Sequence, residues 1–469
     1  MKQKKVLHFV GIGGMGMSAI ANAFLEQGYK VQGSDVLDND YTASLKEKGV
    51  RIFQEHSKGN IKGADLLIVS TAIPDDSLEV LAAKELGIRV IHRSVALQML
   101  AKNKRMIAVS GTHGKSSISA MLVSIFGADN ASFVIGAPIK TKNGVIMGGH
   151  AANAPIFIAE ADESDRSFLH YKPETAIINN IDADHMDNYN SLDDIENAFL
   201  AFARNVSKNI VISADDYGAK RLTKHIVDGR VDGERVLANL ITVGEDLGAD
   251  VRISDVTVSE NGLQIMWNLK SDLLQIDTHL RINSPALYHV PNSSMAFVAA
   301  LLNEATPEQA KQGIEDFCGA EHRFEIRGEI NDILIIDDYA HHPTAITALL
   351  KSARQLWKRR GSKGKIRILY QPLVFSRTRI FQREIAEALQ AADEIIVTQI
   401  FDSREPFDPN TTPETVTQHI DATTREVYAI ADLETALKKL TFDAVPGDII
   451  ITAGGGDIGI RTRHIVDLV

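Results

Sequence analysis

Residues 106–116 read MIAVSGTHGKS, and they say more about this chain than any other stretch of it. The apolar run MIAV predicts a buried strand, and residues 116–126 predict a helix that follows a short glycine loop. Backbone N–H groups of such a loop can surround phosphate oxygens, its lysine reaches the terminal phosphates, and its hydroxyl can ligate Mg²⁺. The usual phosphate-loop pattern begins with a glycine, where this chain has Val109. The remaining loop predicts a nucleoside triphosphate site made by Gly111, Thr112, His113, Gly114, Lys115 and Ser116.

A second glycine loop lies nearer the start of the chain. The strand expected over residues 6–10 is followed by GIGGMG at residues 11–16 and then by a helix. Glycines there allow a tight turn and a close approach of the backbone to a diphosphate, although a turn needed only for packing is the alternative. Asp35 ends the next expected strand, where it could bind a ribose or cap a helix. The glycines of this loop are Gly11, Gly13, Gly14 and Gly16.

The presence of two phosphate-binding loops narrows the class of function. A nicotinamide oxidoreductase needs only the first loop, and a phosphate-loop NTPase needs only the second. A chain with both is expected to bind a nucleotide-linked substrate and, separately, a nucleoside triphosphate.

Two polar segments follow expected strands further along, EADESD at residues 160–165 and NNIDADHMD at residues 179–187. Ligands of parallel sheets bind at the carboxyl ends of strands, so both segments should meet the phosphate loop. Carboxylates and an imidazole beside phosphate oxygens are suitable Mg²⁺ ligands. Glu160 and His185 stand nearest the strand ends, and we predict that they ligate Mg²⁺ together with Ser116. Three further acids are expected to face solvent or to cap helices: Asp165, Asp182 and Asp187.

A third polar segment, DDYAHHP at residues 337–343, follows the apolar run ILII. Two acids, a tyrosine and two histidines in so short a stretch are unusual for a solvated turn. Downstream, the arginines of SRTR at residues 376–379 could hold a carboxylate or a phosphate. The last part of the chain is therefore expected to contribute its own binding groups.

Strands and helices alternate through most of the chain, which predicts parallel sheets in an α/β fold. A polar segment at residues 101–105 precedes a new apolar strand, and the pattern restarts near residues 327–329. After residue 240, alternating stretches such as VRISDVTV predict antiparallel ribbons. We predict three α/β domains, over residues 1–105, 106–326 and 327–469.

The composition excludes several classes of protein. The chain has 469 residues, of which 44% are hydrophobic and 24% are charged, as in soluble globular proteins. Its net charge of −11 disfavours a nucleic-acid or anionic-membrane partner, because phosphate backbones are held by Lys and Arg. The single cysteine, Cys318, excludes an internal disulfide, and no stretch approaches the roughly 18 apolar residues of a membrane span. We expect a cytoplasmic protein that acts on small molecules.

Taken together, the motifs resemble those of the Mur ligase family. In that family's order the chain carries GIGGMGMSAIA, STAIP, SGTHGKS, EADESDRSF, NIDADHMD, HRFE, DDYAHHP, SRT and GGGDI. The resemblance covers essentially the whole chain and is closest to the alanine-adding branch. It implies a Rossmann-like N-terminal domain for a UDP-linked substrate, a central ATPase domain of the phosphate-loop type and a Rossmann-like C-terminal domain for the amino acid.

The resemblance also implies the reaction and the residues that perform it. ATP and Mg²⁺ would drive formation of an amide bond between UDP-N-acetylmuramate and L-alanine or another amino acid, through an acyl phosphate. Implied catalytic residues are Lys115, His185, Tyr339, His341 and Arg377. Implied nucleotide contacts beyond the phosphate loop are Asn292, Arg323 and Asp338. Implied contacts of the UDP end, beyond the glycines of residues 11–16, are Ser34, Asp35 and Ser70.

Three motifs depart from the family's usual form. The phosphate loop continues GKSSIS instead of GKTTT, and serine keeps the needed hydroxyl. The helix on the adenine side keeps Asn292 but has Pro291 and Met295 where the family has a histidine and an asparagine. The motif QPHRYTRT becomes QPLVFSRT, so that Leu373 and Val374 replace a histidine and an arginine. These changes concern recognition of the base and of the acceptor, whereas the groups that activate phosphate are kept.

Three other functions stay open as alternatives. A Mur-like paralogue would use another amino acid or a preformed peptide. A nicotinamide oxidoreductase would use the first glycine loop but leaves the second loop and the acidic segments unexplained. A regulator that binds nucleotide without turnover would explain the altered QPLVFSRT motif, and measurement of nucleotide turnover distinguishes it from the enzymes.

Overall fold

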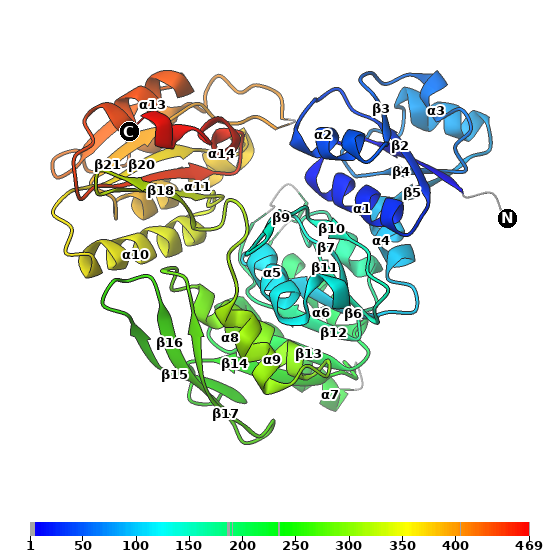
Figure 1. The fold of residues 1–469 in the computed structure, drawn as a ribbon, viewed down its shortest axis with the longest axis horizontal. Coiled ribbons are helices and arrows are strands. Elements are labelled where there is room, and N and C mark those ends of the chain that lie inside the picture. Colours follow the sequence, from blue (N-terminus) through cyan, green and yellow to red (C-terminus); the bar gives the residue numbers. More distant parts are fainter. Residues whose placement is uncertain (1–4, 185–187, 190, 233–234, 404, 469) are drawn as a thin grey trace.

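The computed structural model of the chain describes residues 5–184, 188–189, 191–232, 235–403 and 405–468. Its main sheets follow one another along the chain, and Figure 1 shows them as three lobes coloured blue, cyan to green, and yellow to red. Helices pack around each sheet, so the central strands are continuous apolar runs buried on both faces. The α/β fold with three sheets agrees with the sequence analysis.

The first sheet is wholly parallel, with the order β3-β2-β1-β4-β5 of a Rossmann-type domain. The strand order reverses between β1 and β4, and ligands of such sheets bind at the carboxyl end of that point. The glycine loop at residues 11–14 lies there, between β1 and α1. The strands are β1 (Val6–Val10), β2 (Lys30–Ser34), β3 (Arg51–Phe53), β4 (Leu66–Val69) and β5 (Arg89–His92). The helices are α1 (Met15–Glu26), α2 (Asp40–Glu47), η1 (Lys58–Ile61), α3 (Leu78–Glu85) and α4 (Arg93–Leu100).

The central sheet has the order β10-β7-β11-β6-β12-β13-β14-β15-β16-β17. Its parallel part places β6, which precedes the phosphate loop, between β11 and β12, which precede the two acidic segments. The antiparallel ribbons predicted after residue 240 are β15 to β17, and Figure 1 shows them extending away from the rest of the lobe. A separate hairpin joins β8 to β9.

The elements of this part of the chain are bounded as follows. The first half has β6 (Arg105–Ser110), α5 (Lys115–Phe126), η2 (Ala128–Asn130), β7 (Ala131–Val134), β8 (Ile139–Thr141), β9 (Gly144–Ile146), β10 (Gly149–His150), β11 (Ile156–Glu160), η3 (Ser167–His170) and β12 (Thr175–Ile178). The second half has α6 (Leu192–Arg204), β13 (Asn209–Ser213), α7 (Tyr217–Asp232), β14 (Asn239–Gly244), β15 (Val251–Val258), β16 (Ile265–Ser271), β17 (Ile276–Ile282), α8 (His289–Leu301) and α9 (Pro307–Glu315).

The third sheet has the order β18-β19-β23-β20-β21-β22, parallel except for the antiparallel edge strand β18. The return of β23 between β19 and β20 distinguishes it from the first sheet. Its strands are β18 (Glu325–Ile330), β19 (Ile333–Asp338), β20 (Ile366–Gln371), β21 (Glu394–Val397), β22 (Glu426–Ala429) and β23 (Ile449–Gly454). Its helices are α10 (Pro343–Arg359), α11 (Phe375–Leu389), α12 (Pro413–Thr417), α13 (Leu433–Phe442), α14 (Ile458–Arg461) and η4 (Ile465–Leu468).

The first and central lobes pack tightly where α1 meets β10. The Asn22 side chain donates to the carbonyl of Gly149 at 2.6 Å. A Cβ atom on Gly149 would lie only 1.8 Å from the carbonyl oxygen of Ala19, so this close approach requires glycine. Arg463, near the end of the chain, forms an ion pair with Asp40 of the first lobe. The three lobes are thus in mutual contact.

Strand β18 begins at Glu325 and pairs with β19, so the predicted boundary at residues 326/327 falls inside a strand of the third sheet. The boundary at residues 105/106 falls at the start of β6. Among the described residues, no helix combines the length and the apolar character needed to cross a membrane.

Candidate active site

The phosphate loop connects β6 to α5, and Gly114 lies at the helix N-terminus with a φ of +85°. A Cβ atom there would approach the Asn179 side-chain nitrogen to 2.5 Å, so both conformation and space require glycine. Asn180 accepts from the backbone N–H of His113 at 2.7 Å, and Asn179 donates to the His113 carbonyl at 3.0 Å. Two asparagines after β12 therefore fix the loop, and the amides at the start of α5 can face an anion.

Lys115, the first residue of α5, forms an ion pair with Glu163. Its Nζ lies 2.8 and 2.9 Å from the two carboxylate oxygens and 2.7 Å from the carbonyl of Gly111. Burial lowers the pKa of Lys115, but the neighbouring carboxylates, Glu163 first, outweigh it, so the net pKa is raised. The ammonium group is therefore charged, and it sits where a nucleotide phosphate would compete with Glu163.

Glu160 ends β11 beside this ion pair. Its Oε1 accepts from the backbone N–H of Gly136 at 2.9 Å, and its carboxylate is close to the Ser116 hydroxyl. Burial raises the pKa of Glu160, although the Gly136 N–H, Lys115 and Ser116 oppose the shift. A buried carboxylate and a hydroxyl beside a phosphate loop form an oxygen-donor set that suits Mg²⁺. The other predicted ligand, His185, lies outside the described residues.

Arg323 brings the segment before β18 to the same place. Its guanidinium lies 3.4 Å from the Ser116 hydroxyl and stacks on the Tyr339 ring, 4.7 Å from the ring centre. Asn292, a predicted nucleotide contact, lies against the loop, because a Cβ atom on Gly114 would be 3.1 Å from its Oδ1, which also accepts from Asn179 at 3.1 Å. Arg323 and Tyr339 are thus brought to the phosphate loop.

Asp338 has a different environment from the one the resemblance implies. Its carboxylate accepts from the backbone N–H groups of Phe324 and Ala340, both at 2.7 Å, and from the Tyr288 hydroxyl at 3.1 Å. Burial raises the pKa of Asp338, which Arg323 partly offsets. Asp338 therefore supports the turn that presents Arg323, and a direct nucleotide contact by Asp338 stays a prediction.

The third lobe reaches the central one through Arg377. Its Nε and a terminal nitrogen lie 2.9 and 2.8 Å from one oxygen of Asp184, and both side chains are buried. His341 Nδ1 lies 2.8 Å from the Tyr339 carbonyl oxygen. That contact requires a proton on Nδ1, which leaves Nε2 as the free acceptor. Burial, helped by Arg377, lowers the pKa of His341 well below its usual value.

The glycine loop of the first lobe is braced by Asp35. One Asp35 oxygen accepts from the N–H of Gly13 at 2.7 Å, and the other accepts from the N–H of Leu37 at 2.9 Å. Gly11 has a φ of +76°, and Gly14 lies at the start of α1. Gly16 faces Arg93, whose nitrogen would lie 3.5 Å from an added Cβ. Asp35 thus shapes the loop, and a ribose contact stays a prediction.

Ser34 contacts the glycine loop through its backbone, since its carbonyl accepts from the N–H groups of Gly11 and Ile12 at 2.8 and 3.1 Å, but its side chain turns inward. Its hydroxyl is fully buried and donates to Glu79 at 2.7 Å. Burial alone would raise the pKa of Glu79, but hydrogen bonds, with His8 and Ser34 foremost, lower it to about 2. A buried carboxylate needs such donors, and this explains why Ser34 turns inward. Ser70, also predicted to contact substrate, follows the carboxyl end of β4 and accepts from Ile73 through its carbonyl.

Two acids that were expected to face solvent or to cap helices form ion pairs with residues of another lobe. Asp165 pairs with Arg93 of the first lobe at 3.1 Å, and its neighbour Asp162 pairs with the same guanidinium at 2.9 Å. Asp182 lies between His113 and His342 of the third lobe. Asp165 also accepts from the N–H of Ser167 at 3.0 Å, at the start of η3, so the capping expected of it is present. The contacts of both acids with another lobe were missed, because a single sequence does not show which surfaces a second lobe covers. Asp187 lies outside the described residues.

Several functional groups were missed in the sequence. Glu163 and Asn180 stand within quoted motifs, but their partners could not be read from spacing. Arg93 begins α4 in the segment RVIHRS, which carries no glycine loop or acidic cluster. The available signal was the position of Arg93, a cation directly after a strand of the parallel sheet, because ligands bind at the carboxyl ends of such strands.

Val374 offers a test of strain at this site. It precedes α11 with φ +55° and ψ 144°, a region that disfavours side chains with a Cβ atom. Val374→Gly is expected to raise the free energy of unfolding by about 1 kcal/mol, the relief of strain less the flexibility added to the unfolded chain. Denaturant unfolding measures the change. Val374→Ala is the matched control, and an equal gain in both variants would contradict the argument.

Comparison with known proteins places the chain. Sequence profiles match residues 6–105 as "Mur ligase family, catalytic domain", residues 109–300 as "Mur ligase middle domain" and residues 322–456 as "Mur ligase, glutamate ligase domain". With the phosphate loop and its carboxylates, these matches define an ATP-dependent, amide-bond-forming ligase. The chain belongs to the Mur ligase family.

Relatives and solved structures agree with this placement. The UDP-N-acetylmuramate–L-alanine ligase of Bifidobacterium adolescentis is 37% identical, covering 96% of this chain and 90% of its own length. The protein of the same name from Thermobifida fusca is 37% identical, covering 98% and 96%. The crystal structure of the UDP-N-acetylmuramate-alanine ligase of Thermotoga maritima has a TM-score of 0.79 at 26% identity and covers 99% of each chain.

Proposed function

We propose that this chain joins L-alanine to UDP-N-acetylmuramate at the expense of ATP, in the synthesis of peptidoglycan precursors. The observation that carries the proposal is the cluster of Lys115, Ser116, Glu160 and Arg323 at the end of the central sheet. Relatives that carry the name of this activity match almost the whole chain. The substrates are small molecules, and a cytoplasmic location without nucleic-acid partners stays an expectation.

Each lobe has one task in this proposal. Residues 1–105 bind the UDP end of the donor at the glycine loop, residues 106–326 bind ATP, and residues 327–469 bind the amino acid. Ser116 and Glu160 would hold Mg²⁺ with His185, and the bound ion would neutralise phosphate charge. Lys115 and the amides of the loop bind the triphosphate. When ATP binds, Lys115 exchanges its ion pair with Glu163 for contacts with the phosphate oxygens.

The reaction has two steps. A carboxylate oxygen of the donor attacks the γ-phosphorus, the bond to the β-phosphate oxygen breaks, and an acyl phosphate and ADP form. The amine then attacks the acyl carbon, phosphate leaves with the bonding electron pair, and the amine loses a proton. The departing phosphate takes up that proton. His341 Nε2 orients the amine by accepting a hydrogen bond, because Nδ1 faces the Tyr339 carbonyl and Nε2 keeps its lone pair. Arg323 and Arg377 stabilise negative charge near the transferred group.

A second acceptor specificity is supported by one observation. Leu373, which replaces the family's histidine, lies against Gly455, where an added Cβ would be 2.5 Å from Leu373 Cδ2 and 3.1 Å from His341 Nδ1. An apolar side chain beside His341, where the family has a histidine, would change which acceptors can bind there. A paralogue that uses another small amino acid or a peptide is the alternative function.

Release of ADP and phosphate tests the proposal directly. Purified protein is incubated with ATP, Mg²⁺ and UDP-N-acetylmuramate, and L-alanine, glycine, L-serine or a peptide is added in turn. We expect turnover that depends on both donor and acceptor and is highest with L-alanine. Turnover only with another acceptor would reassign the specificity and attribute it to the replacement at Leu373. Without turnover for any acceptor, the proposed reaction is wrong.

A further inference from the structure

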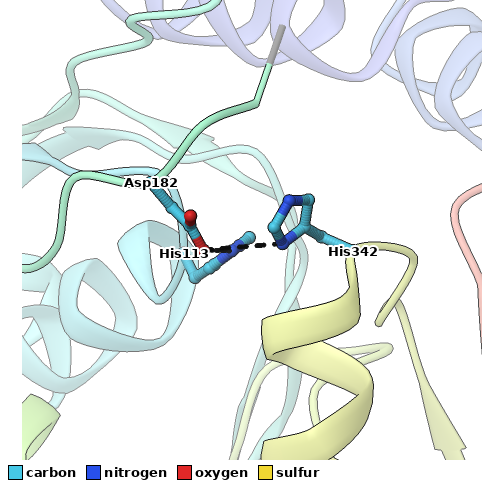
Figure 2. Close-up of side chains that lie close together, drawn as sticks. All are labelled: His113, Asp182 and His342. Atoms are coloured by element: carbon cyan, nitrogen blue, oxygen red, sulfur yellow. Dashed lines mark ion pairs between the residues drawn. The ribbon is translucent and has the colours of Figure 1, made fainter. Parts of the chain in front are cut away.

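A cluster of two imidazoles and one carboxylate joins the central and third lobes, apart from the Glu160 site. Figure 2 shows the Asp182 carboxylate beside the His113 ring and facing the His342 ring, with dashed lines for the ion pairs. His113 belongs to the phosphate loop, Asp182 to the segment after β12, and His342 caps the N-terminus of α10. The proposed reaction uses neither imidazole ring of the cluster and leaves the Asp182 carboxylate without a task.

The spacing of the donor atoms matches a metal site. Asp182 Oδ2 lies 3.8 Å from His113 Nε2 and 3.6 Å from His342 Nδ1. All three donor atoms lie within 4.8 Å of one another. Zn²⁺ bonds of about 2.0–2.2 Å in a tetrahedral site place two ligand atoms roughly 3.4 Å apart. Asp182 Oδ2 is thus within a few tenths of an ångström of this separation from each nitrogen, and the two nitrogens, which lie within 4.8 Å of each other, would adjust as an ion binds.

The donor atoms have lone pairs to offer. Among the described residues, His113 Nε2 is buried and has no hydrogen-bond partner. His342 Nδ1 accepts a long hydrogen bond, 3.4 Å from the N–H of Thr344, and a bound ion would take this lone pair in place of that weak contact. His342 is 3% exposed. Buried imidazole nitrogens without good partners are costly unless a ligand binds them.

The chemistry of the donors also suits a dication. The Thr344 hydroxyl donates to Asp182 Oδ2 at 2.6 Å and orients the carboxylate, as outer partners of metal ligands do. Two imidazoles and a carboxylate suit Zn²⁺ better than Mg²⁺, which favours oxygen donors.

We propose that His113, Asp182 and His342 form a binding site for a transition-metal dication of the Zn²⁺ type. Two ligands belong to the central lobe and one to the third, so a bound ion favours the arrangement in which the lobes are in contact. Three protein ligands leave one coordination position for water or for a substrate group. The site is separate from the Mg²⁺ ligands of the proposed reaction and does not rest on that reaction.

Calorimetric titration of the full chain with Zn²⁺, in excess Mg²⁺ and without nucleotide, tests the site. We expect one Zn²⁺ per chain and an affinity at least about tenfold weaker in Asp182→Asn and in His342→Asn, because each loses a ligand. His342→Cys supplies another Zn²⁺ ligand and is expected to restore binding. Glu160→Gln is the matched control, since it alters the Mg²⁺ site alone and keeps the Zn²⁺ affinity.

The visible spectrum of the Co²⁺-loaded protein gives a second readout. Tetrahedral coordination by nitrogen and oxygen produces intense absorption bands, which Asp182→Asn and His342→Asn should abolish while Glu160→Gln keeps them. Far-UV circular dichroism establishes that each variant is folded. Equal Zn²⁺ affinity in wild type and in both ligand variants would overturn the proposal. Loss of Zn²⁺ binding in Glu160→Gln alone would assign the ion to the Mg²⁺ site and overturn it as well.

Discussion

Replacement of Glu160 by glutamine is expected to abolish turnover and at the same time to stabilise the nucleotide-free protein. Burial raises the pKa of Glu160, so the fold disfavours its ionised form at neutral pH. Glutamine has nearly the same shape, carries no charge and can still accept from the Gly136 N–H. We expect the free energy of unfolding to rise by about 1 kcal/mol and turnover to fall by about 10²–10³-fold.

The raised pKa of Glu160 also predicts how the stability gain of Glu160→Gln depends on pH. The pKa of Glu160 in the folded protein lies above its ordinary value of 4.5. The contribution of Glu160 to stability is therefore complete below pH 4.5 and is lost as the pH rises through the folded pKa, because the carboxyl ionises. The advantage of Glu160→Gln should therefore be absent at low pH and full at neutral pH. Unfolding midpoints in denaturant across this pH range measure it.

Addition of Mg²⁺ separates the proposed role from a packing effect. Mg²⁺ should stabilise the wild type, since an ion that binds only the folded state raises its stability, and should stabilise Glu160→Gln much less. Glu245→Gln, a change at an exposed glutamate, is the control for charge alone. Equal Mg²⁺ protection in wild type and Glu160→Gln would remove Glu160 from the metal site.

The glycine loops and buried strands could be predicted because local chemistry determines them. Gly114 needs a positive φ and has Asn179 at its back, so no other residue type fits that turn. The apolar runs of β6, β11 and β12 follow from burial on both faces of a parallel sheet. Even the placement of Glu160 came from counting to the end of a strand.

Contacts between lobes could not be predicted in the same way. Asp182 and Asp165 have the residue type and spacing of solvated acids, and their partners His342 and Arg93 stand far away in sequence. Ser34 likewise turned out to serve a buried carboxylate, Glu79, which no motif marks. Spacing along one chain does not show which distant side chain completes an ion pair, and such ion pairs help to position the residues of the site.

Replacement of Lys115 by methionine is expected to reduce turnover by about 10³-fold and to weaken ATP binding, because its ammonium group lies against the phosphate loop, 2.7 Å from the Gly111 carbonyl. The same change removes one cation partner of Glu163, which is 2% exposed. Removal of one partner from a buried ion pair costs about 3 kcal/mol or more. Lys115→Met should therefore lower the free energy of unfolding by about 3 kcal/mol as well.

A second substitution separates the two effects. Glu163→Gln in the Lys115→Met background removes the buried negative charge of residue 163. The double variant should therefore regain most of the lost stability, while ATP binding and turnover stay low. Denaturant unfolding and calorimetric titration with ATP measure the two quantities. Lys142→Met, which breaks an exposed ion pair with Asp316, is the control and should change stability by less than about 0.5 kcal/mol. Recovery of ATP binding together with stability would show that Lys115 supports the fold and does not hold phosphate.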